Sequence, residues 1–133
     1  MSRLQPSQAR RRKSELARIL NILGLRMLDI KILFLLYEKC GNGCSCLTAR
    51  EIASALSKSR SSIRSRLKHL ISMGLVRKKR VIHSATQRFV LCYEPALSPS
   101  ELVSWMRQKL FDMFRNLENQ IQVLLKCGDA NAN

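Results

Sequence analysis

The sequence predicts a mainly α-helical chain with one small β-hairpin and a long helix at its C-terminal end. Apolar residues recur at helical spacing through most of the 133 residues. Two apolar and basic runs, residues 75–82 and 88–94, bracket a short polar segment and predict the hairpin. A hydrophobic content of 46% supplies a packed core, and the length fits one domain plus an extension.

The chain begins with a basic segment, residues 1–13, which contains four consecutive cations from Arg10 to Lys13. We expect this segment to be a basic N-terminal arm, either disordered or the frayed start of a helix. A basic arm can lie along phosphates or enter the minor groove of DNA. A solvated tail without a function is the alternative interpretation.

Two helices are expected next. The first runs from Ser14 to Gly24, where glycine ends the apolar repeat. The second runs from about Leu25 to Lys39 and should form the first helix of the central domain. Its predicted inner face consists of Leu28, Ile32, Leu35 and Leu36.

Residues 47–71 predict two short helices joined by a tight polar turn. Thr48 and Glu51 have the spacing of a capping box, in which each side chain bonds the backbone amide of the other residue. Ser59 is the candidate cap of the second helix, and Gly74 ends it. The inner stripe of that second helix consists of Ile63, Leu67, Leu70 and Ile71.

The opposite face of the second helix is polar and basic. Short hydroxyl side chains let a helix approach base edges in a major groove, and guanidinium groups reach phosphates. The alternative is an ordinary surface helix with a solvated face. We expect base contacts from Ser61, Ser62, Ser65, Lys68 and His69, and phosphate contacts from Arg60, Arg64 and Arg66.

The order of helix, turn, helix and basic hairpin resembles a known family. The second helix is followed by Met-Gly-Leu-Val-Arg at residues 73–77 and then by the hairpin. This pattern resembles a winged helix-turn-helix domain over residues 25–94, as in repressors of the multiple-antibiotic-resistance, arsenical-resistance and archaeal sugar-regulator types. The resemblance implies a DNA-binding domain at residues 14–97. It also implies a wing that follows the backbone or enters the minor groove through Lys79, Arg80, His83 and Arg88.

The charge of the chain favours a polyanionic partner. It carries 24 basic and 9 acidic residues, a net charge of +15. Residues 57–88 include ten lysines and arginines and no acidic residue. The excess charge therefore lies where the resemblance places a DNA-binding surface.

Three cysteines, Cys40, Cys44 and Cys46, lie in a seven-residue glycine-rich loop. Their spacing is not a standard zinc spacing and no histidine is near, so we expect no metal site and no other cofactor. Sensors of the arsenical type carry thiolates on the recognition helix or on terminal helices. In this chain the second of the two short helices, which the resemblance makes the recognition helix, has none. A local disulfide, a bridge to Cys92 and free thiols all stay open, as does the state of Cys127. Cys92 lies on a predicted strand and is most simply a core residue.

Residues 98–127 predict one long C-terminal helix, and residues 128–133 a flexible tail. Ser98, Pro99 and Glu101 supply a cap, a proline at the first position and an acidic third position. Apolar residues then follow a heptad seam that is too wide to remain in water, so we expect dimerisation through a coiled coil. The seam consists of Leu102, Met106, Leu110, Met113, Leu117, Ile121 and Leu124.

Neither export nor catalysis finds support in the sequence. No apolar stretch precedes Leu16 and no apolar run approaches about 20 residues, so we expect no signal peptide and no membrane span. We expect a cytoplasmic, nucleoid-associated protein. The two histidines, His69 and His83, lie in basic segments without a nearby carboxylate, and no catalytic motif occurs. We therefore expect no enzymatic activity and no catalytic residues.

These observations favour a sequence-specific transcription regulator that binds double-stranded DNA as a homodimer, with recognition helices in successive major grooves. An architectural, chromatin-like protein with little sequence preference is the first alternative, because small basic archaeal winged-helix proteins are similar. A winged-helix protein-interaction module is the second, and the net charge of +15 argues against it. A small-molecule or redox effector stays open and unidentified.

Overall fold

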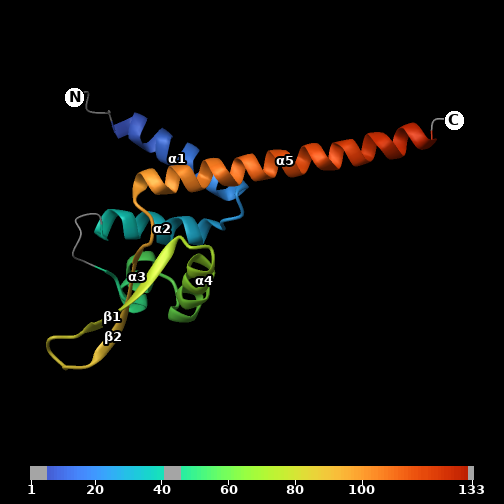
Figure 1. The fold of residues 1–133 in the computed structure, drawn as a ribbon. Helices are drawn as coiled ribbons and strands as arrows, with labels where there is room; N and C mark the ends of the chain where they lie inside the picture. Colours follow the sequence, from blue (N-terminus) through green and yellow to red (C-terminus); the bar gives the residue numbers. More distant parts are fainter. Residues whose placement is uncertain (1–5, 41–45, 132–133) are drawn as a thin grey trace. The chain divides into compact units, whose positions relative to one another are not determined.

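The structure is a computed structural model that describes residues 6–40 and 46–131 (Figure 1). The chain divides into two compact units, Met1–Ser98 and Pro99–Asn133. The predicted fold class, helices with a single hairpin and a long C-terminal helix, is confirmed. In chain order the elements are α1 (Pro6–Ile22), α2 (Met27–Cys40), α3 (Ala49–Leu56), α4 (Arg60–Ser72), β1 (Val76–Ile82), β2 (Phe89–Pro95) and α5 (Pro99–Asn131).

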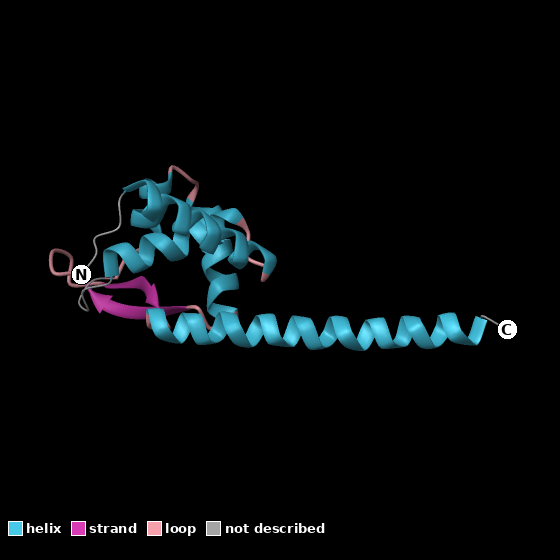
Figure 2. Cartoon of the chain, turned by 90° about the horizontal axis from the view of Figure 1, so that it is seen from above, coloured by secondary structure: helices cyan, strands magenta, loops and turns pink. Residues whose placement is uncertain are grey.

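The core of the first unit lies where α2, α3, α4 and the hairpin meet. Figure 2 shows the hairpin in magenta beside these helices, and β2 packs against α2. Each helix contributes almost fully buried aliphatic side chains, and burying one of these contributes about 1.5–3 kcal/mol. The most buried are Leu20, Leu25, Ile30, Ile32, Leu33, Leu36, Ile52, Ile63, Leu67, Leu70 and Leu75.

The inner face of α2 is wider than its predicted stripe. Ile32 and Leu36 are buried as expected, while Leu28 and Leu35 are only half-buried. Ile30 and Leu33, which the predicted stripe left out, are 1% and 0% exposed. The reason is that α2 contacts α1, α3, α4 and β2, so it is covered on several sides rather than along one stripe.

Local capping sets the boundaries of α3 and α4. The predicted capping box is present, because the Glu51 amide donates to Thr48 Oγ1 at 3.1 Å and the Thr48 amide donates to Glu51 Oε1 at 3.2 Å. Ser59 caps α4 and accepts the amide of Ser62 at 3.2 Å. Gly74 follows α4 with φ of 78°, a left-handed conformation that glycine adopts without strain. The turn chemistry of residues 47–74 was therefore readable in the sequence.

The hairpin is antiparallel and pairs Val76 with Pro95 at its base and Ile82 with Phe89 at its tip. An isolated bridge between Leu47 and Tyr93 ties the segment before α3 to β2, with N–O distances of 3.0 and 2.7 Å. This hairpin confirms the predicted wing.

A disulfide joins Cys46 to Cys92, with Cα atoms 5.4 Å apart. Of the alternatives that the sequence left open, the structure therefore contains the bridge from the loop to Cys92. Cys92 is also buried in the core, as expected. Cys40 and Cys127 are free thiols, and Cys44 lies outside the described residues.

Of the two alternatives for the basic N-terminal segment, the structure contains the start of a helix, and α5 is longer than predicted. Helix α1 begins at Pro6, inside the segment assigned to the arm, and residues 1–5 lie outside the described part of the chain. Proline is favoured at the first helical position, and the arginines and lysine that follow are good helix formers. Helix α5 continues to Asn131, past the predicted end at residue 127, because no proline interrupts it.

The second unit consists of α5, whose 33 residues span about 50 Å at 1.5 Å per residue. Leu102 and Met106 near its start are each 7% exposed. The remaining seam residues are exposed, from 42% at Leu110 to 71% at Leu124. None of the described helices is both long and apolar enough to cross a membrane.

Candidate nucleic-acid interface

The polar face of α4 is open to solvent along most of its length. Opposite the buried stripe of Ile63, Leu67 and Leu70, which are 0–1% exposed, lie hydroxyl and cationic side chains. Six of the eight residues that the sequence assigned to this face are exposed, and His69 is half-buried. The exposed six are Arg60, Ser61, Ser62, Arg64, Ser65 and Lys68.

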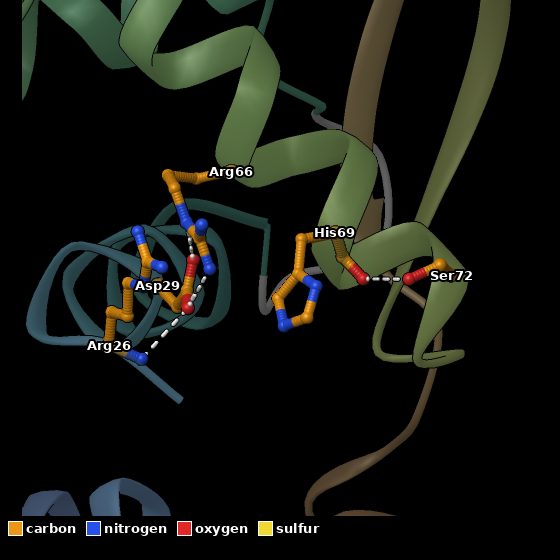
Figure 3. A network of polar contacts seen from close by, with 5 residues as sticks. All are labelled: Arg26, Asp29, Arg66, His69 and Ser72. Carbon is orange, nitrogen blue, oxygen red and sulfur yellow. Dashed lines mark hydrogen bonds and ion pairs between the residues drawn. The ribbon is translucent and has the colours of Figure 1, made fainter. Parts of the chain in front are cut away.

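Arg66 is the exception on this face, because it is bound to a buried carboxylate. Figure 3 shows its guanidinium directed at Asp29 of α2, with Nε donating to Oδ1 at 2.6 Å and Nη2 donating to Oδ2 at 2.7 Å. Asp29 is 0% exposed and also accepts the backbone amide of Arg26 at 2.8 Å. The hydrogen bond to Asp29 raises the pKa of the Arg66 guanidinium. The two partners lie 37 residues apart in the sequence, on α2 and α4.

A groove of about 730 Å³ is lined both by α4, the expected recognition helix, and by the wing. Arg60 and Arg64 line it from the start of α4, and His83 lines it from the hairpin turn. Arg50, in the first turn of α3, lines the same groove and was missed by the sequence analysis. Arg50 lies two residues after the Thr48 cap, at the start of the helix that precedes the polar turn. Three arginines and one histidine thus line this groove, together with the carboxylate of Glu51.

A second groove of about 500 Å³ lies on the other side of α4. The hydroxyls Ser61, Ser62 and Ser65 line it together with Arg66 and with Arg26 from the start of α2. Arg26 is exposed and was also missed. The serines therefore lie between two arginine-lined edges, an arrangement suited to a helix whose centre approaches bases and whose edges approach phosphates.

The wing presents a mixture of paired and solvent-facing cations. Glu94 accepts from Arg77 at 2.7 Å and from Lys79 at 3.3 Å, while Arg80 lies 5.5 Å from the centre of the Phe89 ring. Partial burial acts to raise the pKa of the Glu94 carboxyl, but the bonds and charges of Arg77 and Lys79 together lower it. Lys79 thus has a carboxylate partner. The other residues assigned to the wing, Arg80, His83 and Arg88, are exposed.

The described residues contain no group of three histidine, cysteine or carboxylate side chains placed to hold a metal ion. The thiol of Cys40 lies 3.9 Å from the Tyr93 carbonyl oxygen. Burial, helped by the charges of Glu94 and Glu51, raises the pKa of the Cys40 thiol and favours its protonated form.

Residues 26–77 match a family model described as winged helix-turn-helix DNA-binding. Over the matched residues the chain has the winged helix-turn-helix fold. This family consists of DNA-binding domains rather than enzymes. The matched segment runs from the start of α2 through the first residues of the wing, so it includes the whole of α4.

Solved structures share the winged-helix fold at low sequence identity. A "possible transcriptional regulator" from Methanosarcina mazei is 10% identical, with a TM-score of 0.66 over 80% of this chain and 86% of that chain. The ST1889 protein from Sulfolobus tokodaii is 18% identical, with a TM-score of 0.55 over 86% and 96%. A mutant of S. aureus MepR bound to an oligodeoxyribonucleotide is 18% identical, with a TM-score of 0.51 over 98% and 100%. Curated proteins yield no significant match to the sequence.

Proposed function

We propose that this chain is a sequence-specific transcription regulator that binds double-stranded DNA as a homodimer. The observation that supports it best is the solvent-facing polar side of α4, where Ser61, Ser62 and Ser65 line a groove between arginines. Hydroxyl groups bond base edges, whereas the solvent-facing arginines position the helix on the phosphates. Double-stranded DNA is a partner that fits the net charge of +15, and binding to it would locate the protein at the nucleoid.

The division of roles follows from exposure. Arg60 and Arg64 contact phosphates at the groove shared with the wing, and Arg50 joins them there. Lys68 and His69 lie further along α4 and contact bases near its C-terminal half. Arg66 holds α4 in place rather than contacting the DNA, because its guanidinium is bound to Asp29. In the wing, Arg80, His83 and Arg88 contact the DNA, and Lys79 contributes less because it is paired with Glu94.

The homodimer rests on α5. Leu110, Leu117 and Ile121 are 42%, 54% and 44% exposed on a helix whose apolar residues repeat as heptads. A seam of this width is rarely left in water, and a second copy of the same helix would cover it with matching spacing. Two copies would present two recognition helices to successive major grooves. The oligodeoxyribonucleotide complex of a MepR mutant, which has a similar fold, supports DNA as the ligand.

Selection from a random-sequence duplex library with the purified protein tests sequence specificity. We expect one recurring motif, and we expect Ser65→Ala and Lys68→Ala to change that motif more than they change affinity for unselected DNA. Arg64→Ala serves as the matched control and should weaken all duplexes alike. Recovery of unrelated sequences at wild-type affinity would contradict the regulator and favour an architectural DNA-coating protein.

A further inference from the structure

Two large apolar side chains project into solvent at the tip of the wing. Ile82 and Phe89 are 60% and 65% exposed, and they form the last cross-strand pair before the turn. Side chains alternate between the two faces of a hairpin. On the opposite face Val81 and Val90 are half-buried and Cys92 is buried. On the same face as the exposed pair, only the base of the hairpin reaches the core, where Val76 is 3% exposed, so the hairpin packs without its tip pair. The core therefore does not require the exposed pair.

The pair is framed by positive charge. The Arg80 guanidinium lies 5.5 Å from the Phe89 ring centre, and Lys78 lies on the same face as Arg80. His83 and Arg88 follow in the turn, and residues 57–88 contain no acidic residue. A second copy of this tip would be repelled by the same charges. The suitable partner is a polyanion that also offers an apolar surface, and stacked bases lying between phosphates provide both.

The same face of the hairpin is continuous with the recognition surface. Leu91 and Tyr93, two and four residues after Phe89, line the groove that Arg60 and Arg64 line from α4. A strand of seven residues extends about 23 Å, enough to carry the tip from a major groove across one phosphate strand to the next minor groove. A duplex bound in the groove would therefore extend toward Ile82 and Phe89.

We propose that Ile82 and Phe89 form an apolar wedge that enters the minor groove beside the recognition site and partly unstacks one base step. Phenylalanine and isoleucine wedges of this kind kink a duplex toward its major groove. Steps such as TA and CA/TG unstack most easily, so the wedge adds a sequence preference beneath the wing that requires no hydrogen bond to a base. The inference rests on the proposed binding of duplex DNA, and adds bending to it.

The test uses the full chain and a duplex of about 30 base pairs with a fluorescent dye at each end. The duplex is recovered by selection, and a random-sequence duplex is measured beside it. Phe89→Ser and Ile82→Ser should each raise Kd roughly tenfold and restore the end-to-end distance of unbent DNA. The slope of log affinity against log salt should stay unchanged, because no charge is removed. Phe89→Leu should keep most of the bend.

Val103→Ser is the matched control, since Val103 is 45% exposed on α5 but lies off the heptad seam. Thermal unfolding confirms that each variant is folded. Wild-type protein that binds without bending, with Phe89→Ser binding equally well, overturns the wedge and leaves the proposed function intact. Loss of binding to phosphatidylserine vesicles with unchanged DNA binding would assign the pair to a membrane surface and also overturn it. Wild-type protein that binds no duplex contradicts both proposals.

Discussion

Arg66 and Asp29 form a two-bond ion pair that ties the recognition helix to the start of α2. The distances are 2.6 and 2.7 Å, and the side chains are 16% and 0% exposed. Such a fork of two hydrogen bonds fixes direction as well as distance. Because Asp29 also accepts the Arg26 amide, the pair links the rotation of α4 to the first turn of α2.

Arg66→Ala should destabilise the fold rather than remove a phosphate contact. The substitution leaves the Asp29 carboxylate buried without its cation, which costs roughly 3 kcal/mol. Urea unfolding measures this loss. The slope of log affinity against log salt should remain that of the wild type once the folded fraction is accounted for. Arg64→Ala is the control, and should flatten the slope by about one unit with little change in stability. A flattened slope in both variants would show that Arg66 contacts phosphate after all.

Glu94 should make the wing sensitive to acid. Arg77 and Lys79 lower its pKa in the folded protein below the ordinary value of 4.5. A group with a lowered folded pKa stabilises the fold above its unfolded pKa, and the contribution is lost as pH falls through the folded value. Because Arg77 and Lys79 are 61% and 51% exposed, we expect less than about 1 kcal/mol. The stability difference between wild type and Glu94→Gln should be present at pH 7 and vanish below that lower pKa. A difference that persists in acid would rule out the ion pairs as its source.

The Cys46–Cys92 disulfide should stabilise the domain under oxidising conditions. It closes a loop across 46 positions and joins the segment before α3 to β2. Replacing both residues by alanine should cost roughly 2–4 kcal/mol in denaturant unfolding. Cys127→Ser is the control, because Cys127 is an exposed free thiol. Dithiothreitol should lower the melting temperature of the wild type and leave that of the double alanine variant unchanged. Equal sensitivity of the two proteins would contradict the bridge.

Charges placed in the seam of α5 should separate the subunits. Leu117→Asp with Ile121→Asp puts four carboxylates into the proposed dimer, each costing several kcal/mol if buried. Both side chains are about half exposed in the single chain, so the first unit should stay folded. Sedimentation should give a monomer with weak, salt-sensitive DNA binding. Asn116→Asp with Gln122→Asp adds the same charges off the seam and should remain dimeric. Wild-type protein that sediments as a monomer at micromolar concentration would exclude this dimer.

Local chemistry explains which features were predictable. The caps at Thr48 and Ser59, the glycine after α4 and the alternating hairpin act over a few residues, so their positions could be read directly. The Arg66–Asp29 pair and the Cys46–Cys92 bridge join positions far apart in the chain, and spacing alone does not select partners at that distance. The sequence left the basic segment open between an arm and the start of a helix, because a run of cations fits both equally well.

The candidate nucleic-acid interface was predictable to a similar extent. The exposed face of α4 followed from helical periodicity, since burial of Ile63 and Leu67 fixes which residues point outward. Arg26 and Arg50 were missed because they lie on other elements and reach the grooves only through the fold. The exposure of Ile82 and Phe89 also depends on which face of the hairpin meets the core, which the alternation alone does not decide.

The most direct measurement is a hydroxyl-radical footprint of the wild-type protein on a selected duplex, combined with the mass of the complex. The account predicts two chains per duplex and two protected half-sites about 10 base pairs apart, centre to centre. A single protected half-site with one chain bound, or uniform protection that spreads along the duplex as protein is added, would contradict it.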